Sequence, residues 1–276
     1  MEMGSFIEMQ FYNGIEFYSG KNTIKLNSGR AGILHALKCF NCDTVYLPYY
    51  ECESVRDFLI ENRIKINYYS IKSSFEPVLA SNNKETSIVI VNYFGVMSNE
   101  KMINIAQKFN NVIIDNSQAF YAKPIDRCLN VYSTRKFFGV PDGCYVVGDM
   151  VSNINNQYEQ DYSSDTCQYL LERIEYGCEG KAYQNRMQNE ERIANSGIKK
   201  MSKLSQRILA SIDYKIVSEK RKENFDIVDG ILNEKNLLKF SSFLGESYAP
   251  MVYPLVIEDL KLLQYLKFHN IILIKI

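Results

Sequence analysis

Apolar runs typical of β-strands alternate with helical patterns through the first half of the chain. The expected elements, in chain order, are 24–26 (strand), 30–39 (helix), 44–47 (strand), 52–62 (helix), 64–69 (strand), 87–93 (strand), 99–109 (helix), 112–114 (strand) and 144–148 (strand). The run 87–93 is almost entirely apolar, as in strands buried on both faces of a parallel sheet. This βαβ rhythm predicts an α/β fold: a mostly parallel sheet flanked by helices, with right-handed crossovers.

The pattern changes beyond residue 148. Residues 152–200 are polar and rich in Asn, Gln, Glu, Tyr and Arg, so we expect helices there with exposed faces. They would form a subunit interface, a substrate-facing element or a solvated excursion. After them we expect a long helix at 201–232, a strand at 250–257, a helix at 259–268 and a final strand at 271–274. This order predicts a large domain over 1–215 and a partial, small α+β domain over 216–276.

Composition and charge narrow the class of protein. The 276 residues include 46% hydrophobic and 23% charged side chains, the proportions of an ordinary globular chain. With 32 basic and 32 acidic residues the net charge is zero, which argues against a nucleic-acid binder. The sequence contains no run of 18 apolar residues, so it predicts no membrane span. The N-terminus also lacks the pattern of a secretory signal. We therefore expect a cytoplasmic protein.

The seven cysteines do not predict a disulfide framework or a metal site. Cys39 and Cys42 form a Cys-x-x-Cys pair, but a zinc or redox site needs a second pair or nearby histidines. The chain has only His35 and His269. Thiols packed at a helix end are the better interpretation.

Three polar segments follow predicted strands at the edge where parallel sheets bind ligands. Asn27-Ser28-Gly29-Arg30 opens a helix, whose N-terminus offers free N–H groups to a phosphate or is simply well capped. Asp115 ends a strand and serves either a ligand or the next turn. Lys136 lies among aromatic residues beside Arg135, where desolvation and a cationic neighbour would lower its pKa. An anion site, a carboxylate and such a lysine together fit pyridoxal phosphate.

The sequence resembles the DegT/StrS family of sugar aminotransferases. The segments that carry the resemblance are LNSGRAGILHALK (26–38), VYLPYYECESV (45–55), VNYFGVMSNEKMINIAQKF (91–109), VIIDNSQAF (112–120) and VYSTRKFFGVPDGCYVVG (131–148), with a weaker match from 199 to 266. The resemblance implies fold type I, pyridoxal 5'-phosphate as cofactor and a homodimer with active sites at the subunit interface.

The resemblance also implies a role for each matching residue. Lys136 would be the Schiff-base lysine that moves protons between substrate and cofactor. Asp115 would pair with the pyridine nitrogen, and Gln118 would lie near the phenolic oxygen of the ring.

Other matching positions would hold the phosphate and the ring. Gly29 and Arg30 would offer backbone N–H groups to the phosphate. Tyr50 is our candidate for the ring-stacking aromatic, because the usual position two residues on holds Cys52.

The sequence departs from the family pattern at several points. Val131 stands where the family often has a phosphate-binding serine, and Ser133 is a candidate substitute. The asparagine of the Gly-Asn-x-Arg-Met segment is missing from 197–201. Family members also continue for several tens of residues beyond the strand that matches 271–274, so a divergent short member and a truncated chain are both open. A truncated small domain would leave 258–276 poorly ordered or covered by a second subunit.

The leading hypothesis is a pyridoxal-phosphate-dependent aminotransferase. It would move an amino group from glutamate to a keto-sugar nucleotide for surface polysaccharide biosynthesis. A dehydratase of the same fold is one alternative. A catalytically silent homologue that acts as a binding or assembly partner is another. A dinucleotide-binding dehydrogenase is disfavoured, because no Gly-x-Gly-x-x-Gly follows the first strand.

Overall fold

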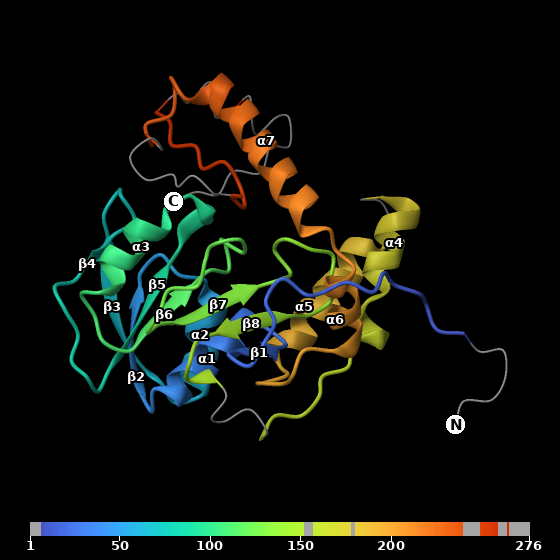
Figure 1. Cartoon of the computed structure of the whole chain (residues 1–276), viewed down its shortest axis with the longest axis horizontal. Helices are drawn as coiled ribbons and strands as arrows, with labels where there is room; N and C mark the ends of the chain where they lie inside the picture. Colours follow the sequence, from blue (N-terminus) through green and yellow to red (C-terminus); the bar gives the residue numbers. More distant parts are fainter. Residues whose placement is uncertain (1–6, 152–156, 178–179, 240–248, 259–263, 265–276) are drawn as a thin grey trace.

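The computed structural model describes residues 7–151, 157–177, 180–239, 249–258 and 264 (Figure 1). The principal elements in chain order are β1 (Thr23–Leu26), α1 (Gly29–Cys39), β2 (Thr44–Pro48), α2 (Glu53–Glu61), β3 (Lys65–Ile71), β4 (Pro77–Val78), β5 (Ser87–Val91), η1 (Tyr93–Gly95), α3 (Asn99–Ala106), β6 (Val112–Asp115), β7 (Leu129–Ser133), β8 (Cys144–Val147), α4 (Gln168–Tyr176), α5 (Ala182–Ala194), α6 (Lys203–Ala210) and α7 (Tyr214–Leu232). The predicted alternation of strands and helices in the first half is therefore confirmed, and two strands that were not expected, β4 and β7, are added to it.

Eight strands of the described residues form one sheet, in the order β1-β8-β7-β6-β5-β2-β3-β4. The central pairs, from β7 through β6, β5 and β2 to β3, are parallel. Antiparallel pairing is confined to the two ends, where β8 lies between β7 and β1, and β4 pairs with β3. Every residue of β5, β6 and β7 is buried, as expected of strands covered on both faces. The mostly parallel sheet is confirmed, with antiparallel ends that the pattern did not predict.

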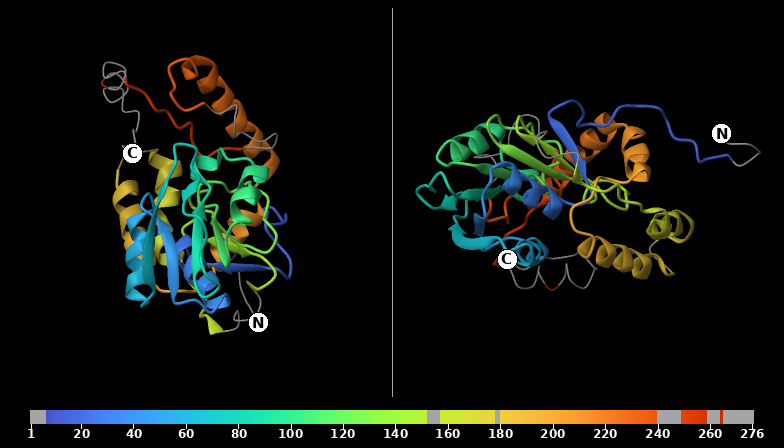
Figure 2. Two further views of the ribbon diagram at one scale, coloured as in Figure 1. Left: turned by 90° about the vertical axis from the view of Figure 1, so that its left-hand side faces the viewer. Right: turned by 90° about the horizontal axis from the view of Figure 1, so that it is seen from below.

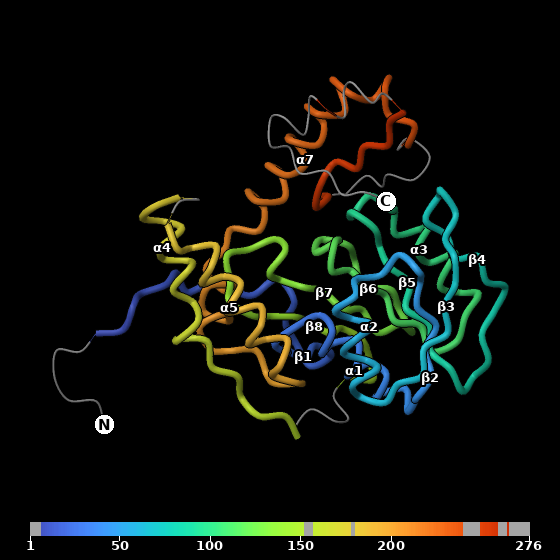
Figure 3. The backbone as a smooth tube through the Cα atoms, turned by 180° about the vertical axis from the view of Figure 1, so that it is seen from behind, coloured from blue at the N-terminus to red at the C-terminus, as the bar shows by residue number. Residues whose placement is uncertain are grey.

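Helices cover the sheet on both faces. Seen from below, the sheet lies between α3 on one side and α1 and α2 on the other (Figure 2). Figure 3 shows α1 and α2 from behind. Close packing holds α1 there: a Cβ atom on its Gly32 would lie 2.8 Å from Cys144 Sγ and 2.9 Å from Val131 Cγ1. Glycine at position 32 therefore lets the backbone of α1 pack directly against β7 and β8.

The segment 199–201 runs along the free edge of β1. The N–H of Asn27 donates to the carbonyl of Lys199 (2.9 Å), and the N–H of Met201 donates to the carbonyl of Lys25 (3.1 Å). Leu26 and Lys200 form an antiparallel bridge. These bonds satisfy backbone groups of an edge strand that would otherwise be exposed. They also fix the chain where it enters α1.

Two predictions for the second half are wrong. The expected helix over 201–232 is two helices, because α6 ends at Ala210 and the side chain of Asp213 caps α7 by accepting from the N–H of Ile216 (3.1 Å). The expected strand at 250–257 is not a strand. Among the described residues, its backbone bonds to two separate places: the N–H of Met251 donates to the carbonyl of Phe94, and the N–H of Leu237 donates to the carbonyl of Val256.

The remaining predictions for the C-terminal part are not tested. The helix at 259–268 and the strand at 271–274 lie outside the described residues, apart from residue 264. The domain boundary near residue 215 stays a prediction. In the part of the chain that is described, no helix has the length and apolar character needed to cross a membrane.

Candidate functional site

The carboxyl ends of β6 and β7 place Asp115 and Ser133 at one edge of the sheet. The two strands are parallel, and Asp115 is opposite Val131, two residues before Ser133. The side chain of Asp115 is buried, and its Oδ1 accepts a hydrogen bond from the N–H of Ser117 at 2.8 Å. The carboxylate is therefore held by the turn that follows its own strand.

The N-terminus of α1 lies at the same edge. The Ser28 side chain caps the helix by accepting from the N–H of Ala31 (3.3 Å). The first-turn N–H groups of Gly29 and Arg30 have no partner within the helix. A Cβ atom on Gly29 would lie 3.1 Å from Ser117 Oγ and 3.8 Å from Ser133 Cβ. The positive end of the helix thus lies close to the side chains of Ser117 and Ser133, and helix N-terminal N–H groups are suited to bind an anion.

Arginine side chains add positive charge to this end of α1. The guanidinium of Arg30 is half-buried and lies over the ring of Phe58, 5.8 Å from its centroid. Burial lowers the pKa of Arg30, and the nearby charge of Arg135 lowers it further. Arg135 itself forms an ion pair with Glu190 of α5. The charge of Glu190 acts on both arginines beside the helix N-terminus.

Gln118 and Tyr50 approach the same edge from two loops. Gln118 Oε1 accepts from the N–H of Phe94 (2.9 Å), which leaves the amide NH₂ group as its donor end. The half-buried ring of Tyr50 stacks on Tyr93 with centroids 5.4 Å apart and planes at 23°. The Tyr93 hydroxyl donates to the carbonyl of Tyr50 at 2.8 Å. The ring of Tyr50 is therefore already packed on another aromatic ring.

Lys136 lies on the turn after β7, at the same edge. The N–H groups of Phe137 and Phe138 both donate to the carbonyl of Thr134, which forms the turn. The two phenylalanines are buried, but Lys136 is exposed. The expected desolvation of this lysine among apolar groups is therefore wrong for the isolated chain. Its neighbour Arg135 is moreover engaged by Glu190.

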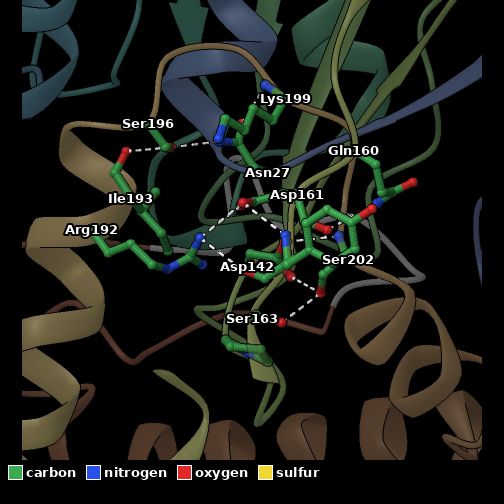
Figure 4. Close-up of polar contacts among 12 residues, drawn as sticks. Asn27, Asp142, Gln160, Asp161, Ser163, Arg192, Ile193, Ser196, Lys199 and Ser202 are labelled. Atoms are coloured by element: carbon green, nitrogen blue, oxygen red, sulfur yellow. Dashed lines mark hydrogen bonds and ion pairs between the residues drawn. The ribbon is translucent and has the colours of Figure 1, made fainter. Parts of the chain in front are cut away.

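A buried polar network fixes the lysine turn to the rest of the molecule. Thr134 Oγ1 donates to the carbonyl of Gly143 (2.9 Å), whose N–H donates to the carbonyl of Asn27 (2.8 Å). Gly143 has φ +133°, and a Cβ there would lie 2.4 Å from Thr134 Oγ1, so only glycine fits. Asp142 accepts from the N–H (2.9 Å) and the hydroxyl (2.8 Å) of Ser202 (Figure 4). The turn that carries Lys136 is thus locked to the start of α6.

Helix α7 also contacts the lysine turn. The Arg221 guanidinium lies over the ring of Phe137, 4.5 Å from its centroid, and donates to the Phe137 carbonyl at 3.4 Å. It also donates to the carbonyl of Met251 at 3.2 Å. Sequence reasoning missed Arg221, since nothing in the helical pattern of this segment marks one charged residue among many.

Glu51 is a second residue that sequence reasoning missed. One carboxyl oxygen, Oε1, accepts from the N–H of Cys52 at 2.7 Å, while Oε2 is buried without a partner among the described residues. Burial raises the pKa of Glu51 to about 8, and the charge of Asp115 contributes to the rise. The available signal was its position: Glu51 follows Pro48, the last residue of β2, by three residues. In the sheet, only β5 separates β2 from β6, which ends at Asp115.

Cys39 of the Cys-x-x-Cys pair lies beside His35 of the same helix, α1. Cys39 Sγ lies 3.4 Å from His35 Nε2, and His35 Nδ1 lies 2.9 Å from the Tyr158 hydroxyl. Among the described residues, no group of three His, Cys, Asp or Glu side chains is placed to hold a metal ion. The interpretation of packed thiols at a helix end fits this arrangement.

Comparisons with known proteins find similarity in structure alone. No family model matches the sequence, and no curated protein matches it. The sugar aminotransferase CalS13 from Micromonospora echinospora is 16% identical, with a TM-score of 0.57 over 90% of this chain and 72% of CalS13. A DegT DnrJ EryC1 StrS aminotransferase from Brucella abortus is 14% identical, with a TM-score of 0.52 over 90% of this chain and 69% of its own.

A third solved structure carries a cofactor. NtdA from Bacillus subtilis, with bound cofactor PMP, is 13% identical, with a TM-score of 0.57 over 90% of this chain and 57% of NtdA. At identities this low, the structural similarity establishes a shared fold and nothing further. The resemblance noted in the sequence motifs and the similarity in structure therefore agree on one point: this chain has the fold of the DegT/StrS sugar aminotransferases.

Proposed function

We propose that the protein is a pyridoxal-phosphate-dependent aminotransferase. The observation that carries the proposal is the arrangement at one sheet edge: the α1 N-terminus, the buried carboxylate of Asp115 and the amine-bearing turn of Lys136. The fold is that of solved sugar aminotransferases, one of them with bound PMP. The edge offers an anion site, an acid and an amine, which are the three groups that this cofactor needs.

The residues of the edge fit the cofactor. The N–H groups of Gly29 and Arg30, together with Ser133, would hold the phosphate, because Ser133 lies close to the N-terminus of α1. Asp115 would keep the ring nitrogen protonated, and the amide NH₂ group of Gln118 would donate to a ring oxygen. Tyr50 is the candidate for contact with the ring face. When bound, the cofactor supplies an electron sink for the substrate's α-carbon.

Lys136 is the residue that would bind the cofactor covalently and move protons. Its exposed amine lies on a turn fixed by Thr134, Gly143 and Asp142, so the chain can present it at a defined place without burying it. Precise placement of a proton carrier contributes to rate because the reacting atoms need no further search.

The proposed substrates are an amino-acid donor, glutamate, and a nucleotide-linked keto-sugar used for surface polysaccharide. The support is the similarity to sugar aminotransferases and the positive charge of Arg30 and Arg135 at the site. We further propose a cytoplasmic homodimer. Leu171, Ile174, Tyr176, Tyr183 and Met187 of α4 and α5 are exposed apolar side chains that a second subunit would cover.

A labelling experiment tests the cofactor proposal. Purified protein is mixed with pyridoxal phosphate, reduced with borohydride and analysed by peptide mass mapping. The pyridoxyl group is expected on Lys136, and Lys136→Arg should lose it while Lys123→Arg, at an exposed position, should keep it. Label on another lysine, or none, would show that the site is assigned wrongly.

Asp115→Asn separates the enzyme from a catalytically silent homologue. The variant should keep the label on Lys136 but lose transamination with glutamate by orders of magnitude, because an uncharged amide does not hold the ring nitrogen protonated. A parent protein that binds the cofactor but transfers no amino group would favour the silent homologue.

A further inference from the structure

Helix α5 is held in place by buried polar contacts on both sides of Glu190. Asn189, which is fully buried, donates from Nδ2 to the carbonyl of Pro141 at 2.7 Å and so joins the helix to the lysine turn. Arg192 Nη1 donates to both carboxylate oxygens of Asp161, at 2.9 and 3.0 Å (Figure 4). Glu190 lies between these two anchors, so its position beside the lysine turn follows from the packing of the helix.

Two arginines approach the same oxygen of Glu190. Arg135 Nη2 forms an ion pair with Glu190 Oε1, and Arg186 Nε lies 4.0 Å from that oxygen. The Arg135 side chain comes from the lysine turn and is 18% exposed, whereas that of Arg186 comes from α5 and is 60% exposed. The two guanidinium groups therefore converge, from different elements, on one point where an anionic oxygen is held.

The hydrogen bonds of Arg135 are incomplete. Its Nη2 donates to Glu190 Oε1, but its Nε is buried and has no hydrogen-bond partner among the described residues. An arginine binds an anion most strongly when two of its N–H groups each meet an oxygen. A buried N–H group without a partner costs free energy. A ligand that offers several oxygens would satisfy this guanidinium better than Glu190 does.

The charges of this cluster favour a ligand with more than one negative charge. Arg135 and Arg186 carry two positive charges against the one negative charge of Glu190. The pKa of Arg30, at the start of α1, is lowered by burial and then by the charge of Arg135, which indicates a third cation nearby. A diphosphate, with several oxygens and at least two charges, matches such a cluster better than a single carboxylate does.

We propose that Arg135 and Arg186 bind the diphosphate of the nucleotide-linked substrate, and that Glu190 occupies this position until the substrate binds. The exchange replaces one anionic oxygen by another, so the Arg135 guanidinium is paired in both states. The Glu190 side chain is 35% exposed, so its carboxylate can turn to solvent when it is displaced. Because Arg135 directly precedes Lys136, the site would hold the substrate beside the reacting amine. The identity of the substrate rests on the proposed function, whereas the anion site itself needs no cofactor.

Binding of inorganic pyrophosphate, measured by calorimetry at fixed ionic strength, tests the site. Arg135→Gln should weaken binding by about 10- to 100-fold, as expected when charge-assisted hydrogen bonds are lost. Glu190→Gln should strengthen it by about three- to tenfold, because the competing carboxylate is gone. The matched control is Glu191→Gln, at the next and exposed position of α5, which should leave the affinity unchanged.

The sign of the Glu190→Gln effect separates this role from a structural one. If Glu190 only stabilised α5, its loss would weaken binding or leave it unchanged, and either result overturns the proposal. A second variant covers the case in which Arg135→Gln does not fold. Arg186→Gln changes an exposed side chain and should weaken pyrophosphate binding about two- to fourfold. Unchanged affinity in either folded arginine variant, or a parent that does not bind pyrophosphate, also contradicts the proposal.

Two further ligands distinguish the diphosphate from other anions. Saturating pyridoxal phosphate should leave the pyrophosphate affinity of the parent unchanged, and any binding of glutarate, a dicarboxylate, should be the same in Arg135→Gln as in the parent. Competition by pyridoxal phosphate would assign the arginines to the phosphate of the cofactor. Loss of glutarate binding would assign them to the carboxylate of the donor, and both results overturn the proposal. Failure of the parent to bind pyridoxal phosphate would instead refute the proposed function and leave the pyrophosphate measurements intact.

Discussion

Helices α1 and α7 show two different ways of holding a helix in this fold. In α1, seven of 11 residues are buried, from Ala31 to Leu37. In α7, which has 19 residues, Phe225 is the one buried residue. Figure 1 shows the same contrast, with α1 against the sheet and α7 reaching away from it. Burial along most of its length fixes α1, whereas α7 is held at fewer points, by Tyr214 and Val217 on an aromatic cluster and by the hydrogen bonds of Arg221.

This contrast indicates which parts of the molecule hold the groups of the candidate site in fixed positions. The start of α1 supplies the N–H groups of the candidate anion site, and a shift of that helix would spoil the site. Helix α7 reaches the site through Arg221, and a long side chain tolerates small movements of its helix. A difference in packing thus separates a fixed part of the site from an adjustable one.

The largest expected effect is loss of stability in acid through His35 of α1. The ring is fully buried, and burial lowers its pKa to about 4. The unfolded chain takes up a proton near pH 6.5, so stability present above that pH is lost as the pH falls to about 4. The loss should be about 3 kcal/mol. Urea unfolding at several pH values measures it.

A matched variant isolates the contribution of His35 from that of the carboxylates. His35→Gln keeps polar atoms but does not titrate, so its unfolding free energy should lack this decline between pH 6.5 and 4. If the unfolding free energies of the parent and of His35→Gln decrease in parallel as the pH falls, the buried His35 is not the cause of the loss of stability in acid.

A smaller effect on stability is expected when a glycine of each helix is replaced by alanine. Gly32→Ala should destabilise the protein by about 1–2 kcal/mol, because its Cβ would meet Cys144 Sγ at 2.8 Å and Val131 Cγ1 at 2.9 Å. The strain exceeds the gain in helix propensity. The variant should also bind pyridoxal phosphate more weakly, since α1 must move away from the sheet.

Gly230→Ala is the counterpart in α7 and should act in the opposite direction. Among the described residues, no atom outside the neighbouring helical backbone lies within 4 Å of a Cβ at Gly230, so alanine adds helix propensity without a new contact. The expected gain is about 0.5–1 kcal/mol. Urea midpoints of the two variants test the comparison, and a stabilising Gly32→Ala would show that α1 is not tightly packed.

Most strands and helices before residue 148 were predictable from apolar runs and helical spacing, whereas β4 and β7 were not among the expected elements. The break at 211–213 was not, since Ile212 continues the helical spacing and only the cap formed by Asp213 marks a new start. The run 250–257 is apolar enough for a strand, yet its backbone groups bond to Phe94 and Leu237 rather than to a ladder. Tertiary contacts therefore determine the structure of these two segments.

The site divides in the same way. Lys136, Asp115 and Gly29 were predictable from turns and strand ends that local sequence encodes. Glu51 was not, because its importance comes from burial beside residues more than 60 positions away. The exposure of Lys136 also went against expectation, since its aromatic neighbours pack inward without covering it.

The closure of β1 by residues 199–201 has a consequence for the order in which the molecule is made. Strand β1 is the first to leave the ribosome, but its sheet partner β8 begins at Cys144, and its outer edge pairs with Lys199 and Met201. A growing chain therefore keeps β1 without its sheet partner until β8 has been made, and the outer edge of β1 stays open until residues 199–201 follow. Contacts so distant in sequence are slow to form and leave apolar surface open meanwhile. We expect the candidate anion site, which opens directly from β1, to be among the last features of the fold to be completed.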